Sequence, residues 1–353
     1  MINIVIPMCS QSLYEANSGF AYPKLLTEIA NKTLFEYSQD VFKSICDEHK
    51  IIYVAPSDNL NKFGLKSIIG TISGKKGKIV SVRGTTKGAV CSCLMAIDEI
   101  NLGSELIISS ADHYIGKDLQ EVIDNFRAMN CDAGVLTFQS VHPKWSFVVL
   151  NDNGEVIQAT EKDPVSRNAV AGLYYFKKAS DFVSAAKNLI RKDNSIDGSY
   201  YLSSCLNELV LDGKIIKVHQ LDSSVYHNFY DVHAVNSFGM SLENDTSKVC
   251  DFTKQYVDAF NSKDIDEVMQ MFEDNAYLIE PDEIFIGRER IGERIANIFS
   301  TPDLAFSTNA IICQEYKSVI EFQLTLGNDV VRGVDVIEWG RSGKIERLTA
   351  YLM

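Results

Sequence analysis

The sequence has few of the features that mark metal clusters or membrane proteins. Its eight cysteines form no Cys-x-x-Cys pair, and Cys91 and Cys93 are too closely spaced for a zinc site. We therefore expect buried free thiols in a reducing cytosol. Neither a signal-peptide pattern nor a run of about 20 apolar residues is present. The expected location is cytoplasmic, with no membrane association.

Basic charge is also scarce, because 47 acidic residues outnumber 34 lysines and arginines and give a formal net charge of −13. A nucleic-acid surface needs a basic face, so no nucleic-acid partner is expected. A nucleotide ligand is compatible with this charge, since one lysine and a divalent cation suffice to hold its phosphates.

Glycine is missing from the first loop. Residues 2–6 (INIVI) predict a buried strand, and the polar loop that follows, from Cys9 to Tyr14, runs on without glycine until Gly19. Phosphate-binding loops are usually glycine-rich because backbone N–H groups must approach the phosphates closely. The loop is either an altered phosphate loop or something else.

The first part of the chain predicts an α/β fold. Strands alternate with helices, which indicates a mostly parallel sheet with helices on both faces and ligands beyond the carboxyl ends of its strands. The expected strands are 2–6, 50–54, 78–82, 105–110, 132–138, 170–176 and 214–220, and the expected helices are 33–46, 87–100, 117–128, 179–191 and 200–211. Segments 145–150 and 156–160 predict a hairpin that turns at Asn153-Gly154.

The last part of the chain has a different pattern. Residues 241–248 are polar and have no apolar period, so we place the boundary there, between domains at 1–240 and 246–353. Helices are expected at 249–262 and 264–273, and then a strand that leads into a further helix. Four segments at 308–315, 317–326, 330–339 and 344–352 complete an α+β pattern.

Three residues suggest phosphate chemistry, each with a plainer alternative. Asp112 follows an apolar strand and can hold Mg²⁺, or it can be a turn or cap residue. Asp231 can be a second metal ligand or a helix cap. Lys24, presented by Pro23, can contact phosphate or can be solvated.

Two short motifs suggest ligand contacts. Glu161 and Lys162 can bind a substrate hydroxyl or amine and a phosphate, although an exposed ion pair is the commoner meaning of this pattern. Residues 84–89 (GTTKGA) form a turn into a helix whose small residues let backbone approach a flat ring, but their spacing is not that of a Walker A loop. Arg83 is a phosphate contact or a surface charge.

In this order, these motifs resemble the sugar-phosphate nucleotidylyltransferase family, over about residues 1–238. The stretches that carry the resemblance are "YPKLL", "GTTKGAVCSCLMAID", "LIISSADHYIG", residues 133–176 and "FYDVHAVNSF". It looks closest to the bacterial branch associated with capsule and surface-polysaccharide genes. The resemblance implies a GT-A-like fold, in which a nucleoside triphosphate reacts with a phosphorylated small molecule and releases pyrophosphate.

The resemblance also implies roles for individual residues. Lys24, Asp112 and Lys162 would be catalytic, and Asp112 and Asp231 would bind Mg²⁺. Glu161, Lys162 and Gly172 would bind the phosphorylated substrate. The nucleotide would contact Met8, Ser10, Gln11, Ser12, Arg83, Gly84, Thr85, Ala89 and Ala111.

The first loop departs from the family pattern. Ser10 and Ser12 stand where the family has glycines, and Tyr14 stands where it has a catalytic arginine. Serine at a position that needs a positive φ costs on the order of 1 kcal/mol, so we expect the loop to take another shape. Tyrosine cannot replace a bidentate guanidinium, and the cations that can compensate are Lys24, Arg83 and Lys87.

The C-terminal part, about 246–353, resembles the NTF2-like or SnoaL-like superfamily, through residues 257–299 and the closing strands. Such domains are often dimerisation modules and sometimes enclose small-molecule pockets. We expect a homodimer through this domain or a role accessory to the substrate. Tyr277, Glu280, Asp335 and Glu338 can line a pocket, or can be ordinary sheet-face residues.

Three functions remain open at this point. The first is an Mg²⁺-dependent nucleotidylyltransferase that uses CTP or UTP and a sugar 1-phosphate or another small phosphorylated metabolite. The second is a non-catalytic or regulatory nucleotide-binding relative, which the altered loop favours. The third is a GT-A glycosyltransferase, although Ser110-Ala111-Asp112 offers one acidic residue where an Asp-x-Asp motif would be wanted.

Overall fold

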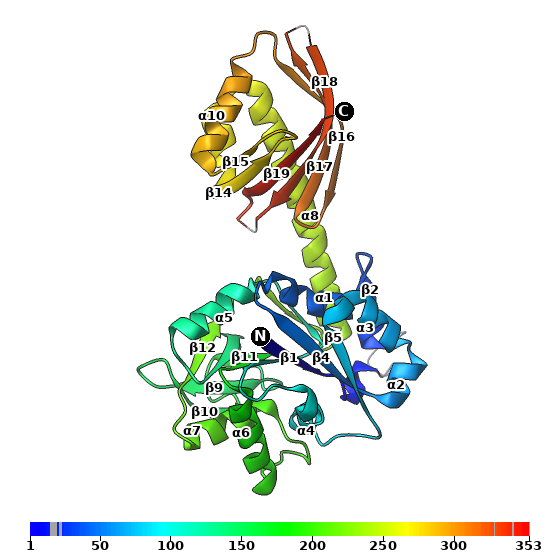
Figure 1. The fold of residues 1–353 in the computed structure, drawn as a ribbon, viewed down its shortest axis with the longest axis vertical. Helices are drawn as coiled ribbons and strands as arrows, with labels where there is room; N and C mark the ends of the chain where they lie inside the picture. The colour runs from blue at the N-terminus through cyan, green and yellow to red at the C-terminus, as the bar shows by residue number, and fades with distance from the viewer. Residues whose placement is uncertain (15–19, 21–22, 328, 341, 353) are drawn as a thin grey trace. The chain divides into compact units, whose positions relative to one another are not determined.

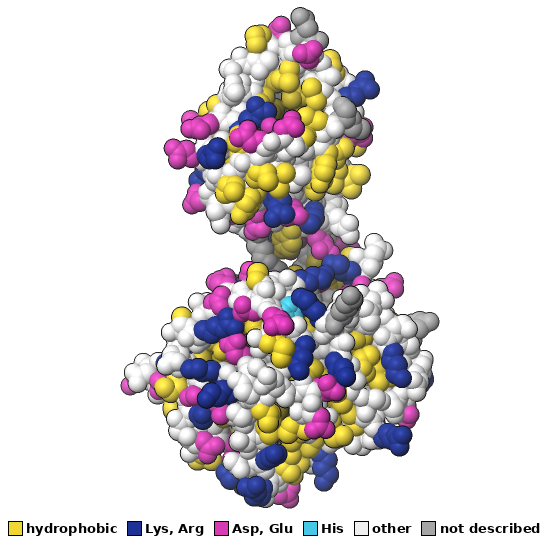
Figure 2. Space-filling view, viewed as in Figure 1, with side chains coloured by type: hydrophobic (Ala, Val, Ile, Leu, Met, Phe, Trp, Pro, Cys, Tyr) yellow, Lys and Arg dark blue, Asp and Glu magenta, His cyan; other side chains and the backbone are white. Residues whose placement is uncertain are grey.

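The computed structural model describes residues 1–14, 20, 23–327, 329–340 and 342–352. Gly19 and Tyr22, which belong to segments discussed above, lie outside the described residues. The chain divides into two compact units, Met1–Asn236 and Ser237–Met353 (Figure 1). On the face drawn in Figure 2, acidic and basic side chains are interspersed over each unit.

Parallel strands form the middle of the sheet in the first unit. Strand β1 (Ile2–Pro7) lies between β4 (His49–Pro56) and β6 (Glu105–Ser109), and it is parallel to both. Strand β5 (Gly77–Val82) pairs in parallel with the far side of β4. The carboxyl ends of four strands therefore lie along one edge of the sheet, as the alternating pattern predicts.

Antiparallel strands extend the sheet beyond β6. The central one is β11 (Asn168–Phe176), which pairs antiparallel with β6, with β8 (Ala133–Gln139) and, through one residue, with β9 (Ser146–Leu150). The expected hairpin is confirmed, because β9 pairs antiparallel with β10 (Val156–Glu161). Strand β12 (Ile216–Gln220) is parallel to β8. The sheet is therefore mostly parallel at its centre and mixed toward one side.

Helices cover both faces of this sheet because the side chains of β1 alternate between two cores. Ile2, Ile4 and Ile6 pack into one core cluster and Val5 into the other. The first face is covered by α1 (Leu34–Asp40), α2 (Ser57–Lys62), α3 (Leu65–Ser73) and α5 (Leu119–Ala128). The second face is covered by α4 (Ala89–Leu94), α6 (Ala179–Arg191) and α7 (Leu202–Leu211).

Two expected helices are shorter in the structure. The helix expected at 87–100 is only α4, followed by a 3-10 turn at Ile97–Glu99. It begins after Gly88, whose φ is +91° and where an added Cβ would lie 2.5 Å from the carbonyl oxygen of Tyr200. The helix expected at 33–46 begins with a capping box at Thr33 and Glu36, and it changes to a 3-10 helix at Val41.

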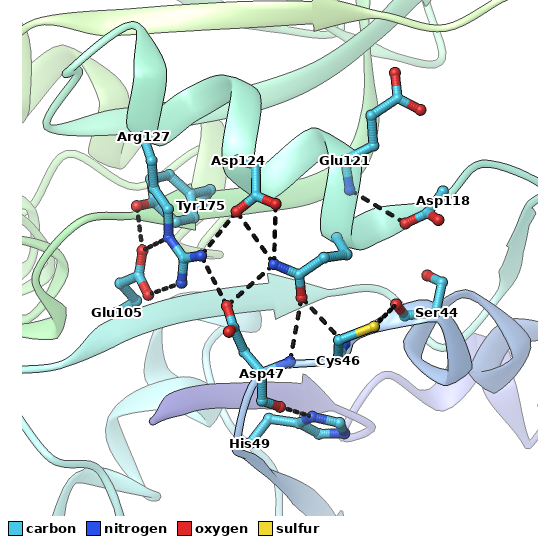
Figure 3. Close-up of polar contacts among 11 residues, drawn as sticks. Ser44, Cys46, Asp47, His49, Glu105, Asp118, Glu121, Asp124, Arg127 and Tyr175 are labelled. Atoms are coloured by element: carbon cyan, nitrogen blue, oxygen red, sulfur yellow. Dashed lines mark hydrogen bonds and ion pairs between the residues drawn. The ribbon is translucent and has the colours of Figure 1, made fainter.

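A polar network stabilises the amino edge of the sheet (Figure 3). Arg127 of α5 contacts Glu105 at the start of β6 (Nη2–Oε2 2.6 Å) and Asp47 just before β4 (Nη1–Oδ2 2.7 Å). Gln120, two turns earlier on the same face of α5, accepts hydrogen bonds from the backbone N–H groups of Cys46 and Asp47. These contacts hold α5 against two strands and leave the opposite, carboxyl edge for a ligand.

A single long helix, α8 (Val232–Ser262), runs through the expected linker. Residues 241–248, where the polar pattern placed the domain boundary, lie inside α8, and Leu242 is buried. Their polarity reflects mostly solvent-facing positions, which a helix tolerates without an apolar stripe at every turn. Within the described residues, α8 and the other helices are either too short or too polar to cross a membrane.

The second unit combines helices with one antiparallel-rich sheet, as the α+β pattern predicts. Helices α9 (Ile265–Gln270) and α10 (Arg288–Phe299) accompany α8, and the helix expected at 264–273 gives way to a strand at Phe272. The strand order is β15-β14-β19-β18-β17-β16. The bounds are β14 Phe272–Ile279, β15 Ile284–Ile286, β16 Ala305–Gln314, β17 Lys317–Leu326, β18 Asp329–Trp339 and β19 Ile345–Leu352.

The cysteines are not all free thiols. Cys250 of α8 and Cys313 of β16 form a disulfide, so the expectation of free thiols is wrong for this pair. Six cysteines are free, and three of these, Cys93, Cys131 and Cys205, are buried. The two cysteines are 63 positions apart in the sequence, so their pairing cannot be predicted from the spacing of cysteines along the chain.

Candidate functional site

Two pockets lie where the parallel strands end. The first, here called the β1–β5 pocket, has a volume of about 340 Å³ and is lined by residues that follow β1, β4 and β5. The second, the β6 pocket, has a volume of about 180 Å³ and is lined by residues that follow β6, together with residues of β9, β10 and β11. Both positions agree with the rule that ligands bind at the carboxyl edge of such sheets.

A buried ion pair lies beside the β6 pocket. The Lys24 ammonium is 2.8 Å from Asp112 Oδ2, and only 3% of the Lys24 side chain is exposed. Burial would raise the pKa of Asp112, but the Lys24 charge and hydrogen bonds from Lys24 and Ser110 outweigh it and lower that pKa below its usual value. Asp112 therefore brings an ionised carboxylate to the pocket wall, and Lys24, which is not itself a lining residue, is the buried cation in direct contact with it.

His113 and Gly172 shape the wall next to this pair. Burial lowers the pKa of His113 to about 4, so the imidazole is neutral at neutral pH, and its Nε2 lies 3.1 Å from the Ser109 hydroxyl. Gly172 has a φ of +76°, and a Cβ there would lie 3.2 Å from Nδ1 of His113. A side chain at 172 would be strained and would crowd the pocket that this glycine lines.

The predicted Glu161-Lys162 pair separates in the structure. Glu161 lines the β6 pocket, where its carboxylate accepts hydrogen bonds from the hydroxyls of Ser146 and Ser203. The Lys162 side chain is half exposed, and its nearest carboxylate is Asp197 at 3.9 Å. Lys162 is not among the residues that line the pocket, so the geometry favours Glu161 as a substrate contact over Lys162.

Asp231 caps the N-terminus of α8. Its Oδ1 accepts a hydrogen bond of 2.8 Å from the backbone N–H of Ala234, and the residue does not line the β6 pocket, although Asn228 and Tyr230 do. In the part of the chain that the structure describes, no group of three or more His, Cys, Asp or Glu residues forms a metal cage. Mg²⁺ commonly takes one or two carboxylates and completes its shell with water and substrate phosphates. Asp112, with Asp231 as the second ligand that the resemblance implies, fits that sparse arrangement.

The first loop avoids the conformation that glycine would allow. Ser10 has a φ of −67°, Ser10 and Ser12 share a hydrogen bond of 2.8 Å, and no described residue from 8 to 14 has a positive φ. Tyr14 is 9% exposed, donates a hydrogen bond of 2.7 Å to the Met8 carbonyl and stacks on Phe63. Tyr14 thus forms part of the apolar wall of the β1–β5 pocket and brings no cation to it.

The other predicted nucleotide contacts divide into two groups. Gln11, Gly84 and Thr85 line the β1–β5 pocket. Met8 and Ala111 are buried, Ser12 and Arg83 are exposed, and Ala89 is the first residue of α4. Neither Arg83 nor Lys87 is among the described lining residues of this pocket, so the structure gives neither of them the role of replacement cation.

The structure adds residues that the sequence did not single out. Lys62 lines the β1–β5 pocket, with its ammonium 5.0 Å from the centre of the Phe63 ring. In the β6 pocket, the Lys144 ammonium lies 4.7 Å from the centre of the Trp145 ring and 5.0 Å from that of Tyr230. One signal in the sequence could have found this cluster, because Trp145 is one of only two tryptophans and stands at the start of a predicted strand.

Fold and pockets together define an α/β domain with a divided ligand site at the carboxyl edge of its sheet. The family described as Nucleotidyl transferase matches residues 21–198, and the SnoaL-like domain family matches residues 253–348. The chain belongs to the nucleotidyl transferase family, because that match covers half of its length. Its second unit is an NTF2-like α+β domain.

Solved structures share the fold of the first unit. A nucleoside-diphosphate-sugar pyrophosphorylase from Vibrio cholerae RC9 aligns at 20% identity and a TM-score of 0.59, over 67% of this chain and 99% of that one. A putative glucose-1-phosphate thymidylyltransferase from Bacillus anthracis, in complex with sucrose, aligns at 13% identity and a TM-score of 0.55, over 68% and 94%. The search of curated proteins found no match.

Proposed function

We propose that the chain is an Mg²⁺-dependent nucleotidylyltransferase that joins a nucleoside triphosphate, CTP or UTP, to a sugar 1-phosphate or another small phosphorylated metabolite. The observation that carries this proposal is the Lys24–Asp112 pair at the edge of the β6 pocket. A buried ammonium favours phosphate, and a carboxylate beside it suits a divalent cation.

Two pockets at one sheet edge suit a two-substrate reaction. The β1–β5 pocket has an aromatic wall and the loop residues Gly84 and Thr85, which suit a base. It also has one lysine, Lys62, which suits a phosphate. The β6 pocket has the Glu161 carboxylate, aromatic rings and Asp112, which suits a small polar molecule with a phosphate. Two structures with a similar fold, a nucleoside-diphosphate-sugar pyrophosphorylase and a putative glucose-1-phosphate thymidylyltransferase, are consistent with these substrate classes.

The reaction follows from charge and position. An oxygen of the metabolite's phosphate attacks the α-phosphorus of the triphosphate, a new P–O bond forms, and the bond to pyrophosphate breaks. Lys24 neutralises phosphate charge, Glu161 orients the metabolite, and Gly172 lets it approach the backbone. Mg²⁺, held by Asp112 and Asp231, would supply further neutralisation of the triphosphate.

Pyrophosphate release tests the proposal directly. Each of the four nucleoside triphosphates is mixed with Mg²⁺, the full chain and a panel of sugar 1-phosphates and other small phosphorylated metabolites. We expect release with one pair of substrates, loss of release in EDTA, and loss in Asp112→Asn but not in the exposed hairpin variant Asp152→Asn. Release that continues unchanged in Asp112→Asn would contradict the assignment of the site.

A second candidate function is nucleotide binding without chemistry, and one observation favours it. Tyr14, at the position of the family arginine, is turned into the protein and bonded to the Met8 carbonyl. The triphosphate then lacks a bidentate clamp. If calorimetry shows that a triphosphate binds, and no substrate pair in the panel releases pyrophosphate, this second function is supported over the first.

Three further parts of the proposal do not rest on the site. A role in capsule or surface-polysaccharide biosynthesis and a homodimer formed through the second unit rest on the resemblance, and a cytoplasmic location rests on the cysteine and signal-peptide patterns of the sequence. Sedimentation of the full chain beside a chain ending at Asn236 tests the homodimer. If both chains sediment with the same number of protomers per particle, dimerisation through the second unit is contradicted.

A further inference from the structure

A further pocket of the first unit lies at the amino edge of the sheet, and the proposed reaction does not use it. This amino-edge pocket has a volume of about 160 Å³. It is bounded by the start of β4, the end of α3 and the 3-10 helix Val41–Ser44. His49, the first residue of β4, lines it, whereas Pro56, the last residue, lines the β1–β5 pocket. At about 3.3 Å per residue these two residues are roughly 23 Å apart, so the two pockets are separate sites.

The cavity of the second unit provides a contrast in charge. Glu280 and Asp335 line it, as the sequence predicts, and Tyr277 and Glu338 do not. The one cation among its described lining residues, Arg294, is bonded to Glu280, with Nη2 2.8 Å from Oε2. Its charged groups are therefore acidic or already paired, which does not suit an anion.

The amino-edge pocket has the opposite charge. Lys43 and Lys76 line it together with the imidazole of His49, and none of the described residues that line it is acidic. This lining runs against the composition of the chain, whose formal net charge is −13. Two ammonium groups in a hollow that no carboxylate lines attract an anion.

Lys76 contacts a neutral ring in place of a carboxylate. Its ammonium lies 3.2 Å from Nε2 of His49, and no described carboxylate pairs with it. The other ring nitrogen, Nδ1, lies 2.8 Å from the carbonyl oxygen of Asp47 (Figure 3). Nδ1 therefore carries the ring proton, and Nε2 accepts from the ammonium. The His49 side chain is buried, so it holds the ammonium at the pocket while two of the three ammonium protons remain for a ligand.

Lys43 shares its carboxylate partner with a second lysine. Its ammonium lies 2.6 Å from Oδ1 of Asp40, and Oδ2 of the same carboxylate lies 3.5 Å from the ammonium of Lys32. Asp40 does not line the pocket. Lys43 can therefore donate to an anion in the pocket and keep its contact with Asp40, because an ammonium has three protons.

The walls of the pocket define the rest of the ligand. Phe42, Ile51 and Ile72 supply apolar surface. Tyr53 donates a hydrogen bond of 2.9 Å to Oε1 of Gln39, so these two buried polar groups satisfy each other. A cavity of about 150 Å³ holds one benzene ring, which sets the size of the ligand body. The ligand is therefore small, with one charged end and one apolar part.

The charge favours a phosphate over a carboxylate. A phosphate monoester carries roughly two negative charges near neutral pH, which match two ammonium groups, whereas a carboxylate carries one. The planar carboxylate is also best matched by a guanidinium, and no arginine is among the described residues that line the pocket. Lysine ammonium groups act as point charges and suit the tetrahedral arrangement of phosphate oxygens.

We infer that the amino-edge pocket binds a small phosphorylated organic molecule, with its phosphate dianion on Lys76 and Lys43 and its body against Phe42 and Ile72. This site lies at the far end of β4 from the proposed nucleotide pocket. A ligand bound there takes part in no step of the proposed transfer reaction.

The test uses phenyl phosphate as the probe, titrated into the full chain at about pH 7.5, where the phosphate is a dianion. Calorimetry reports on all sites, and NMR of the imidazole nitrogens separates them. The His49 signals, identified with His49→Gln, report on this pocket, and those of His113 report on the β6 pocket. We expect phenyl phosphate to shift the His49 signals to saturation, benzoate to bind there at least tenfold more weakly, and phenol not to bind.

Two variants locate the charge contact. Lys76→Met is expected to weaken the binding of phenyl phosphate at His49 at least tenfold, and Lys66→Met, an exposed lysine on α3, is the matched control with unchanged binding. Near-ultraviolet circular dichroism establishes that each variant is folded, and Lys43→Met replaces Lys76→Met if the latter is not. The inference is overturned if phenyl phosphate and inorganic phosphate both leave the His49 signals unmoved, if benzoate binds there as tightly as phenyl phosphate, or if the folded lysine variant binds phenyl phosphate as tightly as the natural chain does.

Discussion

The Lys24 ammonium and the Asp112 carboxylate lie 2.8 Å apart, and each is the other's charge partner at the β6 pocket. A phosphate that binds Lys24 competes with Asp112, and a cation that binds Asp112 competes with Lys24. The pair therefore keeps two charges in place near the pocket before substrates arrive. Ligand binding replaces one set of charge contacts with another, so no charge has to become buried without a partner.

The first prediction concerns this pair. Asp112→Asn is expected to reduce pyrophosphate release at least 100-fold, since electrostatic groups at a transferring phosphate have effects of roughly this size. It should also reduce the free energy of unfolding by up to about 3 kcal/mol, because Lys24 loses its buried partner. Urea unfolding, with Asp152→Asn as the control, measures the second effect.

A double-mutant cycle separates the two effects. Lys24→Met combined with Asp112→Asn should be more stable than Asp112→Asn alone, because no unpaired ammonium remains buried. The activity should stay low in both variants. Strictly additive stability changes would show that the two side chains do not interact in the folded protein.

The second prediction concerns Tyr14. Tyr14→Arg is expected to lower stability by several kcal/mol and not to raise activity, because the side chain at 14 is directed into an apolar wall beside Phe63. Tyr14→Phe should cost only about 1 kcal/mol, the usual contribution of one hydrogen bond such as that to the Met8 carbonyl. A rise in turnover with Tyr14→Arg would mean that residue 14 reaches the triphosphate.

The third prediction concerns Lys62, the cation that lines the β1–β5 pocket. Lys62→Ala should weaken the binding of the triphosphate about tenfold, as expected for one lost charge-assisted contact of roughly 1.5 kcal/mol. Lys66→Ala, an exposed lysine on the neighbouring helix α3, is the matched control. Calorimetric titration with CTP and UTP gives both affinities, and equal losses in the two variants would indicate a general charge effect.

Much of the fold is visible in the sequence because its signals are local. The β-branched runs of β1, β4, β5 and β6 predict buried parallel strands, and Asn153-Gly154 predicts the turn between β9 and β10. The helix through 241–248 was missed for a physical reason. A solvent-facing helical segment has no apolar period to detect. Only its continuity with the buried residues Val249 and Tyr256, which follow it in the same helix, reveals it.

The candidate site is less visible, because its parts come from distant segments. Asp112 and Glu161 follow strands and could be proposed from position alone. Lys62 and Lys144 acquire a role only when the fold brings them beside Phe63 and Trp145. The separation of Glu161 from Lys162 is also not visible in the sequence, because Lys162 has a positive φ of +57° and does not line the pocket that Glu161 lines.

The last prediction concerns the stability of the second unit as the pH changes. Burial, reinforced by the nearby Glu280 charge, raises the pKa of Asp335 from its ordinary value of 3.8 to about 7 in the folded protein. The folded state therefore holds a proton that the unfolded state releases, and the associated stability is complete below about pH 4 and is lost as the pH rises to about 7. The loss approaches about 4 kcal/mol, because each pKa unit corresponds to about 1.4 kcal/mol.

Asp335→Asn removes this ionisation and keeps the shape of the side chain. The groups that face Asp335 are Tyr256 from α8, Glu280 after β14 and Arg294 from α10, and Arg294 is held by Glu280. Relative to the natural residue, the variant should gain stability steadily between pH 4 and pH 7 and gain no more above it. Urea unfolding reports on the second unit alone through the buried Trp339 in a Trp145→Phe background. Asp251→Asn should show no such trend, and a stability difference for Asp335→Asn that is independent of pH would mean that Asp335 is ionised throughout this range.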